Sequence, residues 1–133
     1  MTGLKDEDYA TLAGFRHALR QFATYSEAAA RQAGLTPQQH QAMLAIRAGP
    51  GGTLHVGKLA ERLLLRPHSA SELVQRMVEQ GLVGRQTGKE DKRQVSLRLN
   101  EHGERILEYL SQSHRAELRR LRPMLHELLA GLG

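Results

Sequence analysis

The chain has 133 residues, a net charge of +5 and no cysteine. This length suits one domain with its own apolar core, and the lack of cysteine excludes disulfide frameworks, thiolate nucleophiles and cysteine-ligated zinc. No apolar run approaches the roughly 20 residues that a membrane span needs, and the first residues are acidic rather than hydrophobic, so we expect a cytoplasmic protein without a signal peptide.

The positive charge is concentrated in the middle third of the chain. Residues 54–99 hold nine Lys and Arg against five Asp and Glu, whereas residues 1–53 have a net charge of +1 and residues 100–133 a net charge of zero. A local basic patch is typical of proteins that bind a polyanion, although a merely solvated basic face has the same composition. Residues 54–99 are therefore the candidate DNA-contacting region.

Residues 6–32 are predicted to form a long amphipathic helix. Apolar side chains recur at steps of three and four residues, which places them on one face; they are Tyr9, Leu12, Phe15, Leu19 and Phe22. Such a stripe forms either part of a core or a subunit interface.

A second helix is predicted over residues 37–48. Thr36 can cap its free amides, Pro37 suits the first helical position because no amide hydrogen is needed there, and Gln39 completes a capping box. The run Gly-Pro-Gly-Gly at residues 49–52 ends this helix.

The next segment has the pattern of a helix-turn-helix. Its first helix is predicted over residues 54–63, with Leu59 and Leu63 on the apolar face. Its second helix begins near Arg66 and Pro67 and ends at Gly81, which suits a left-handed C-cap. Two short helices joined by a tight turn are typical of DNA-binding modules.

The hydrophobic period then changes from helical to strand-like. Residues 82–86 and 94–99 are predicted strands, and the polar residues 87–93 between them form a turn. This predicts a β-hairpin that projects from a helical body.

The last third is predicted to be a long helix capped by Asn100, which Pro123 breaks or kinks so that a short final helix follows. The fold class is therefore mostly α with a small β-hairpin wing. We predict a winged helix-turn-helix in which residues 33–99 bind DNA and the terminal helices, over residues 5–32 and 100–133, dimerise.

Several motifs resemble those of the multiple-antibiotic-resistance regulator (MarR) family of bacterial transcription regulators. The run Leu-Ala-Glu-Arg-Leu at 59–63 resembles the family's first helix of the helix-turn-helix, and Leu-Val-Gln-Arg-Met at 73–77 resembles the end of its recognition helix. The residues that resemble the family's entry to the wing are Gly81, Leu82, Val83 and Arg85. Those that resemble its wing signature are Asp91, Lys92, Arg93, Leu97, Leu99 and Gly103. Three positions depart from the family pattern, namely His55, Arg66 and Asn100, where Ser or Thr is more usual.

The resemblance implies a homodimer whose terminal helices intertwine. It also implies a small aromatic or anionic effector that binds between the dimerisation and DNA-binding parts. The residues predicted to line this cleft are Phe22, Met43, Arg47, Tyr109 and His114. Core packing is the alternative role for the apolar ones.

The start of the second helix of the helix-turn-helix carries the predicted DNA contacts, because the N-terminal residues of a recognition helix meet base edges in the major groove. Arg66 can pair with guanine through two hydrogen bonds, and Glu72 can accept one from cytosine. Arg76 either contacts a phosphate or forms an ion pair with Glu72. The full predicted set is Arg66, Pro67, His68, Ser69, Ser71, Glu72 and Arg76.

The predicted wing turn carries a second set of contacts. Arg93 can enter a narrow minor groove, and Asp91 can hold its guanidinium group by paired hydrogen bonds; the resemblance implies this role for the wing arginine. Lys89 and Lys92 are predicted phosphate contacts. The alternative is a surface ion pair of little energetic weight.

No catalytic or metal-binding motif is present, so we expect no enzyme activity, no cofactor and no metal; zinc bound by His40 with acids from elsewhere is the alternative. We therefore predict a sequence-specific transcription regulator, a repressor, that acts as a homodimer on double-stranded DNA with an inverted repeat and is released by an effector. An architectural DNA-binding protein without an effector and a winged-helix protein-interaction module are the alternatives.

Overall fold

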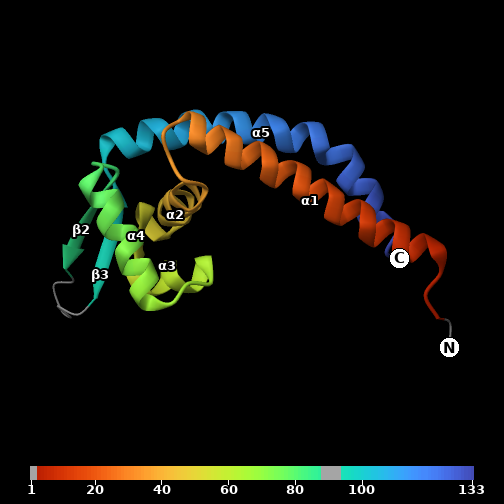
Figure 1. The fold of residues 1–133 in the computed structure, drawn as a ribbon, viewed down its shortest axis with the longest axis horizontal. Coiled ribbons are helices and arrows are strands. Elements are labelled where there is room, and N and C mark those ends of the chain that lie inside the picture. Colours follow the sequence, from red (N-terminus) through yellow and green to blue (C-terminus); the bar gives the residue numbers. More distant parts are fainter. Residues whose placement is uncertain (1–2, 88–93) are drawn as a thin grey trace.

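Two long helices at the two ends of the chain lie side by side and form an arm that extends from a smaller body (Figure 1). The computed structural model describes residues 3–87 and 94–133. Helix α1 spans Asp6–Gln32 and helix α5 spans Glu101–Ala130. They run antiparallel, because Gly14 of α1 lies against Leu128 of α5 and Tyr25 of α1 contacts Ser113.

The body contains three helices and a small sheet. Helix α2 spans Pro37–Ala48, helix α3 spans Val56–Leu63 and helix α4 spans Pro67–Glu79, with a short 3-10 turn at Pro50–Gly52. The strands are β1 at Thr53–His55, β2 at Val83–Thr87 and β3 at Val95–Leu99. This arrangement is a winged helix-turn-helix, as predicted: α3 and α4 are the two helices, and β2 and β3 are the strands of the wing.

Local signals place the start of α2 where the sequence predicted it. The Gln39 amide donates to the Thr36 hydroxyl and the Thr36 amide donates to the Gln39 side chain, each at 3.1 Å. The buried Gln39 side chain also donates to Gln80 at 2.8 Å, just after α4 ends. The capping box therefore begins α2 and ties it to α4.

The sheet has three strands in the order β1-β3-β2, where the sequence predicted a two-stranded hairpin. The predicted helix over residues 54–63 is wrong at its start, because Thr53–His55 pair with β3 and α3 begins at Val56. Leu54 lies opposite Leu97 and both side chains are buried. Burial against β3 thus makes the start of this segment a strand.

The last helix also differs from its prediction. It continues without interruption through Pro123 to Ala130, so no separate final helix forms. Pro123 is exposed, and the carbonyl group that loses its helical hydrogen bond can be solvated there; α5 bends along its C-terminal part (Figure 1). Asn100 occupies the N-cap position, but its side chain makes no capping hydrogen bond to the first turn.

The core lies inside the body, between its helices and the inner face of the sheet. The largest fully buried side chains are Met43, Ile46, Leu59, Met77, Leu97, Leu110, Val74 and Val83. Leu97 and Leu99 point inward from β3 while Arg98 between them is exposed, as the alternation predicted. Among residues 3–87 and 94–133, no helix is long and apolar enough to cross a membrane.

Candidate nucleic-acid interface

Helix α4 buries one face and exposes the other. Its buried residues are Ala70, Leu73, Val74 and Met77, which follow the three- and four-residue spacing of a single helix face. Every predicted contact residue of the recognition helix is exposed; these residues are Arg66, Pro67, His68, Ser69, Ser71, Glu72 and Arg76. With 13 residues, α4 is roughly 20 Å long, so its polar face is long enough to follow several base pairs.

The N-terminal end of α4 is open to an anion. Arg66 occupies the N-cap position and Pro67 the first helical position, and in the described part of the chain no side chain caps the first turn, which carries no acidic residue. The free amides at a helix N-terminus carry a partial positive charge that favours phosphate. The same end therefore offers backbone donors and an arginine to a nucleic-acid strand.

One of the two sequence-based alternatives for Arg76 finds no support. Glu72 pairs with His68, whose Nε2 lies 2.9 Å from the carboxylate, one helical turn before it. No ion pair joins Glu72 to Arg76, both of which are described residues. Glu72 is thereby held at the N-terminal part of α4, beside Arg66 and Ser69 in sequence.

The turn between α3 and α4 is strained. Leu64 ends α3 in the left-handed region, with φ of 56°, and its side chain is 93% exposed. The amide of Leu65 donates to the Ala60 carbonyl at 2.9 Å and that of Leu64 to the Glu61 carbonyl at 3.2 Å, which is the Schellman pattern. Glycine is the usual residue at this position. At the end of α4 the corresponding residue is a glycine, as predicted: Gly81 adopts the left-handed conformation with φ of 71°.

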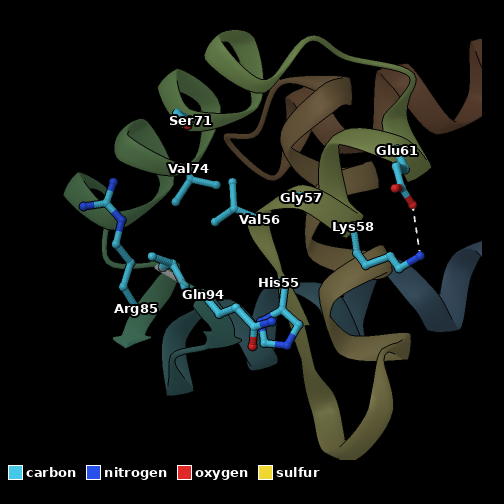
Figure 2. A pocket seen from close by; sticks show the side chains of 10 residues that line it. His55, Val56, Gly57, Lys58, Glu61, Ser71, Val74, Arg85 and Gln94 are labelled. Carbon is cyan, nitrogen blue, oxygen red and sulfur yellow. Dashed lines mark hydrogen bonds and ion pairs between the residues drawn. The ribbon is translucent and has the colours of Figure 1, made fainter. Parts of the chain in front are cut away.

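A hydrogen-bonded chain links the wing to α4. Arg85 on β2 donates to the Gln75 side chain at 2.7 Å, and Gln75 donates to Glu79 at 2.9 Å. Beside this link lies a hollow of about 770 Å³, lined from α3, α4 and the wing strands (Figure 2). Lys58, Ser71 and Arg85 contribute polar groups to it, and Lys58 is paired with Glu61 at 3.1 Å.

Gln75, Arg85 and Lys58 were not among the site residues predicted from the sequence. Arg85 carried a signal, because it belonged to the motif that follows the recognition helix, but its partner on α4 is set by tertiary structure. The wing contacts Lys89, Asp91, Lys92 and Arg93 lie outside the described residues. On either side of them, Thr87 pairs with Val95, and the wing strands remain in register from there to Val83 and Leu99.

A second cavity lies where α1, α2 and α5 meet. It measures about 470 Å³ and is lined by Phe22, Ser26, Glu27, His40, His114 and Arg115 together with apolar side chains. The structure brings the predicted cleft residues Phe22 and His114 together there. It places Met43 in the core, Arg47 on the surface beside Glu104 at 3.2 Å, and Tyr109 at a different cavity of about 260 Å³.

Two histidine rings that contact each other at a tilt of 54° form one wall of this cavity. The rings of His40 and His114 are 4.7 Å apart, and Phe22 and Tyr25 contact the His114 ring edge-on. The Nδ1 atom of His114 lies 2.6 Å from the Leu110 carbonyl oxygen and must donate to it, and the Nε2 atom lies 2.8 Å from the Ser26 hydroxyl.

His40 lies in a less polar setting than His114. Its Nδ1 atom has no hydrogen-bond partner among the described residues, and its side chain is 4% exposed. Burial, and then the charge of His114, lower the pKa of His40.

The sequence left zinc binding by His40 as an alternative. The described residues contain no group of three or more His, Cys, Asp and Glu side chains placed to hold a metal ion.

Solved structures of known proteins share the fold of the chain, and a family profile matches its middle part. In contrast, no curated protein sequence matches the chain. Its fold is similar to that of AbsC, a MarR family transcriptional regulator from Streptomyces coelicolor, with 20% identity, a TM-score of 0.74 and coverage of 98% of this chain and 99% of AbsC. It is also similar to NadR in complex with 4-hydroxyphenylacetate, with 23% identity, a TM-score of 0.69 and coverage of 99% and 95%.

A mutant of S. aureus MepR bound to an oligodeoxyribonucleotide shares the fold at 18% identity, with a TM-score of 0.71 and coverage of 94% of this chain and 98% of that one. The sequence profile of the MarR family matches residues 33–94, which span α2, both helices of the helix-turn-helix and strand β2. Residues 33–94 are thus similar in sequence to the MarR family, and the whole chain is similar in fold to transcriptional regulators of that family.

Proposed function

We propose that this protein is a homodimeric repressor that binds an inverted repeat in duplex DNA through α4 and the wing, and that a small aromatic or anionic effector releases it. The exposed polar face of α4, with Arg66 at its uncapped N-terminus, carries the DNA-binding part of the proposal. A helix of this kind fits the major groove of B-DNA. The MepR structure, which contains an oligodeoxyribonucleotide, supports the same use of the fold.

Specific roles follow from the chemistry of the exposed groups. Arg66 pairs with guanine, and Glu72, held by His68, accepts a hydrogen bond from cytosine. Ser69, Ser71 and Arg76 contact neighbouring bases or phosphates. From the sequence pattern, Lys89 and Lys92 contact phosphates and Arg93, aided by Asp91, enters the minor groove.

The homodimer is supported by apolar surface on the arm. Leu12 and Leu19 of α1 are 54% and 50% exposed, and Leu118 and Leu129 of α5 are 46% and 54% exposed. Leu12 and Leu19 line one open hollow along α1, and Leu118 and Leu129 line another along α5. Exposed apolar surface of this kind is typical of an interaction site. Two-fold symmetry then places two α4 helices about one or two turns of DNA apart.

The effector site is the cavity lined by Phe22, His40 and His114. It combines apolar walls with ring nitrogens, Glu27 and Arg115, which suits an aromatic compound with one polar or charged end. The NadR structure, which holds 4-hydroxyphenylacetate, supports this ligand class. An effector that favours one placement of α2 against the arm shifts the protein toward one spacing of the two recognition helices.

The DNA-binding proposal is tested by selecting bound sequences from a random duplex library and measuring affinities by fluorescence anisotropy. We expect an inverted repeat, and we expect Arg66→Ala to lose about 1–3 kcal/mol of discrimination at one base pair of each half-site. Arg105→Ala is the matched control, because Arg105 is exposed on α5 and paired with Glu101 at 3.0 Å. Equal effects of the two variants would contradict the role of Arg66.

Two other outcomes of this experiment point to the alternative functions. Binding without any selected sequence indicates an architectural DNA-binding protein. No binding to any duplex at low salt, where phosphate contacts are strongest, indicates a protein-interaction module.

The effector proposal is tested by calorimetric titration with 4-hydroxyphenylacetate. We expect binding that Phe22→Ala weakens and that Tyr109→Ala leaves unchanged, because Tyr109 lines the other cavity. Equal weakening by both variants would place the ligand elsewhere, and the absence of binding by a series of aromatic acids would remove the proposed ligand class.

A further inference from the structure

The outer face of α5 carries a row of positive charges beside a row of leucines. Arg115, Arg119, Arg122 and His126 recur at steps of four, three and four residues, so they share one helix face. With Leu118, Leu125 and Leu129 they line one open groove of about 420 Å³ along the arm. We call Arg115, Arg119 and Arg122 the arginine row.

The arginine row has no acidic partner within the described chain. The ion pair found on this part of α5 joins Arg120 to Glu117 at 2.6 Å, and those two residues lie on a different side of the helix. Among the described residues, none of the three arginines of the row forms an ion pair. The groove thus has an apolar floor and an unneutralised basic edge.

The other end of the arm surface carries the opposite charge. The first turn of α1 holds Asp6, Glu7 and Asp8, and the exposed apolar residues Leu12 and Leu19 follow on the same helix. Asp8 accepts a hydrogen bond from the Lys5 amide at 2.9 Å, whereas Asp6 and Glu7 are exposed. We call residues 6–8 the acidic turn.

The acidic turn cannot reach the arginine row of its own chain. Gly14 packs against Leu128 and Thr11 against Gly131, so the acidic turn lies beyond the C-terminal end of α5. Asp8 precedes Gly14 by six residues and Arg122 precedes Leu128 by six, so at 1.5 Å per residue the two side chains attach about 18 Å apart along the arm. Within the described chain no carboxylate pairs with this row, so a second molecule can supply one.

We propose that the acidic turn of a second copy occupies the N-terminal part of the α5 groove and pairs with the arginine row, and that this pairing fixes the relative direction of the two arms. The inference rests on the homodimer of the proposed function. It follows from the order of features on the two helices: the acidic turn precedes Leu12 and Leu19, and the arginine row begins before Leu118 and ends before Leu129.

Only one direction brings the opposite charges together. When the partner's α1 runs along α5 in the same direction, its apolar residues meet the leucine row and its acidic turn lies beside the arginine row. When it runs the opposite way, its acidic turn lies past Leu129, where the row has ended. Because α1 and α5 are antiparallel within each chain (Figure 1), the favoured direction makes the two arms antiparallel, with a winged body at each end.

A charge exchange tests the pairing. One variant carries Asp6→Lys and Glu7→Lys, and the other carries Arg119→Glu and Arg122→Glu; Asp8 is left in place because it caps α1. We expect each variant alone to dimerise at least about tenfold more weakly than wild type, which corresponds to about 1.4 kcal/mol, because like charges meet twice in a two-fold interface. Mixed together, the two variants restore opposite charges at both contacts, so they should form the heterodimer in preference to either homodimer.

Sedimentation equilibrium measures the dimerisation constant of each variant, and native mass spectrometry of differently tagged copies measures the fraction of heterodimer in the mixture. The control is Arg62→Glu with Arg105→Glu, which changes the net charge as much as Arg119→Glu with Arg122→Glu does, at exposed positions of α3 and of the start of α5; we expect it to dimerise like wild type. Raising the salt from about 0.05 M to about 0.5 M, which shortens the Debye length to a few ångströms, should weaken the wild-type dimer and leave the Arg119→Glu, Arg122→Glu variant less affected.

The failures are distinguishable. A wild-type protein that remains monomeric at micromolar concentration would overturn the homodimer and the pairing with it. If the wild-type protein is a dimer but the two mixed variants form heterodimer and homodimers in the statistical ratio, only the pairing is overturned. If Arg119→Glu with Arg122→Glu leaves the dimer unchanged but weakens DNA binding at low salt, the arginine row is a nucleic-acid surface and the pairing is also overturned.

Discussion

The contact between the start of α5 and the base of the wing depends on the absence of a side chain at residue 103. A β-carbon at Gly103 would lie inside contact distance of the Leu82 carbonyl oxygen and 3.1 Å from the carbonyl carbon. Both groups belong to the backbone, and the Leu82 carbonyl also accepts a hydrogen bond from the Asn100 amide at 2.9 Å. Gly103→Ala can therefore be accommodated only if α5 moves away from the segment that joins α4 to β2.

We expect Gly103→Ala to lower the free energy of unfolding by about 2 kcal/mol. Overpacking costs about 1–3 kcal/mol and straining the Asn100–Leu82 hydrogen bond costs about 1 kcal/mol, whereas the better helix propensity of alanine returns at most about 1 kcal/mol. For a chain of this size, this corresponds to a decrease in Tm of roughly 6–10 °C. Urea denaturation followed by circular dichroism measures the change.

Gly57→Ala is the matched control for this change. Gly57 is also near the start of a helix, and a β-carbon there would meet no atom within 4 Å. Propensity alone then operates, so we expect stability to stay the same or rise by up to about 1 kcal/mol. If Gly103→Ala is as stable as Gly57→Ala, the close approach of α5 to Leu82 does not constrain the fold and the reasoning fails.

Three further predictions concern the body and the cavity. Leu64→Gly should raise the free energy of unfolding by up to about 1 kcal/mol in urea denaturation, because Leu64 adopts the left-handed conformation with its side chain exposed; a loss would contradict the strain. Thr36→Ala should lower it by about 1 kcal/mol because the hydrogen bond from the Gln39 amide to the Thr36 hydroxyl is lost, and hydrogen exchange should show the first turn of α2 fraying. The lowered pKa of His40 means that the unfolded chain takes up a proton at a higher pH than the folded one. Stability should therefore be highest above about pH 6.5 and decrease as the pH falls below it, and this decrease, followed by thermal denaturation, should be smaller in His40→Phe.

The parts of the fold that follow from local chemistry were predictable from the sequence. Both ends of α1 and α2 match their predictions, because the acidic first turn, the Thr36–Gln39 capping box and the breaks at Gly34 and Gly49 act within a few residues. The exposed face of α4 was predictable for the same reason, since helical periodicity fixes which side chains point inward. Its DNA contacts, like those of the wing, remain predictions.

The errors occurred where a distant segment decides the structure. Strand β1 forms because β3, some forty residues later, offers it an edge and a buried partner for Leu54. Helix α5 continues through Pro123, with α1 packed along it. The link from Arg85 to Gln75 and the contact between the His40 and His114 rings were missed, because each joins two elements whose relative placement no local pattern contains.

Helix α2 connects the two candidate sites through adjacent residues. Gln39 hydrogen-bonds to Gln80 at the end of α4, while His40 contacts the His114 ring and lines the cavity against the arm. Because the backbones of consecutive helical residues move together, a ligand whose contact with His40 shifts α2 also shifts Gln39, the anchor of α4. On the proposed function, the effector cavity therefore acts on the recognition helix over a single turn of α2, and no rearrangement of the wing is required.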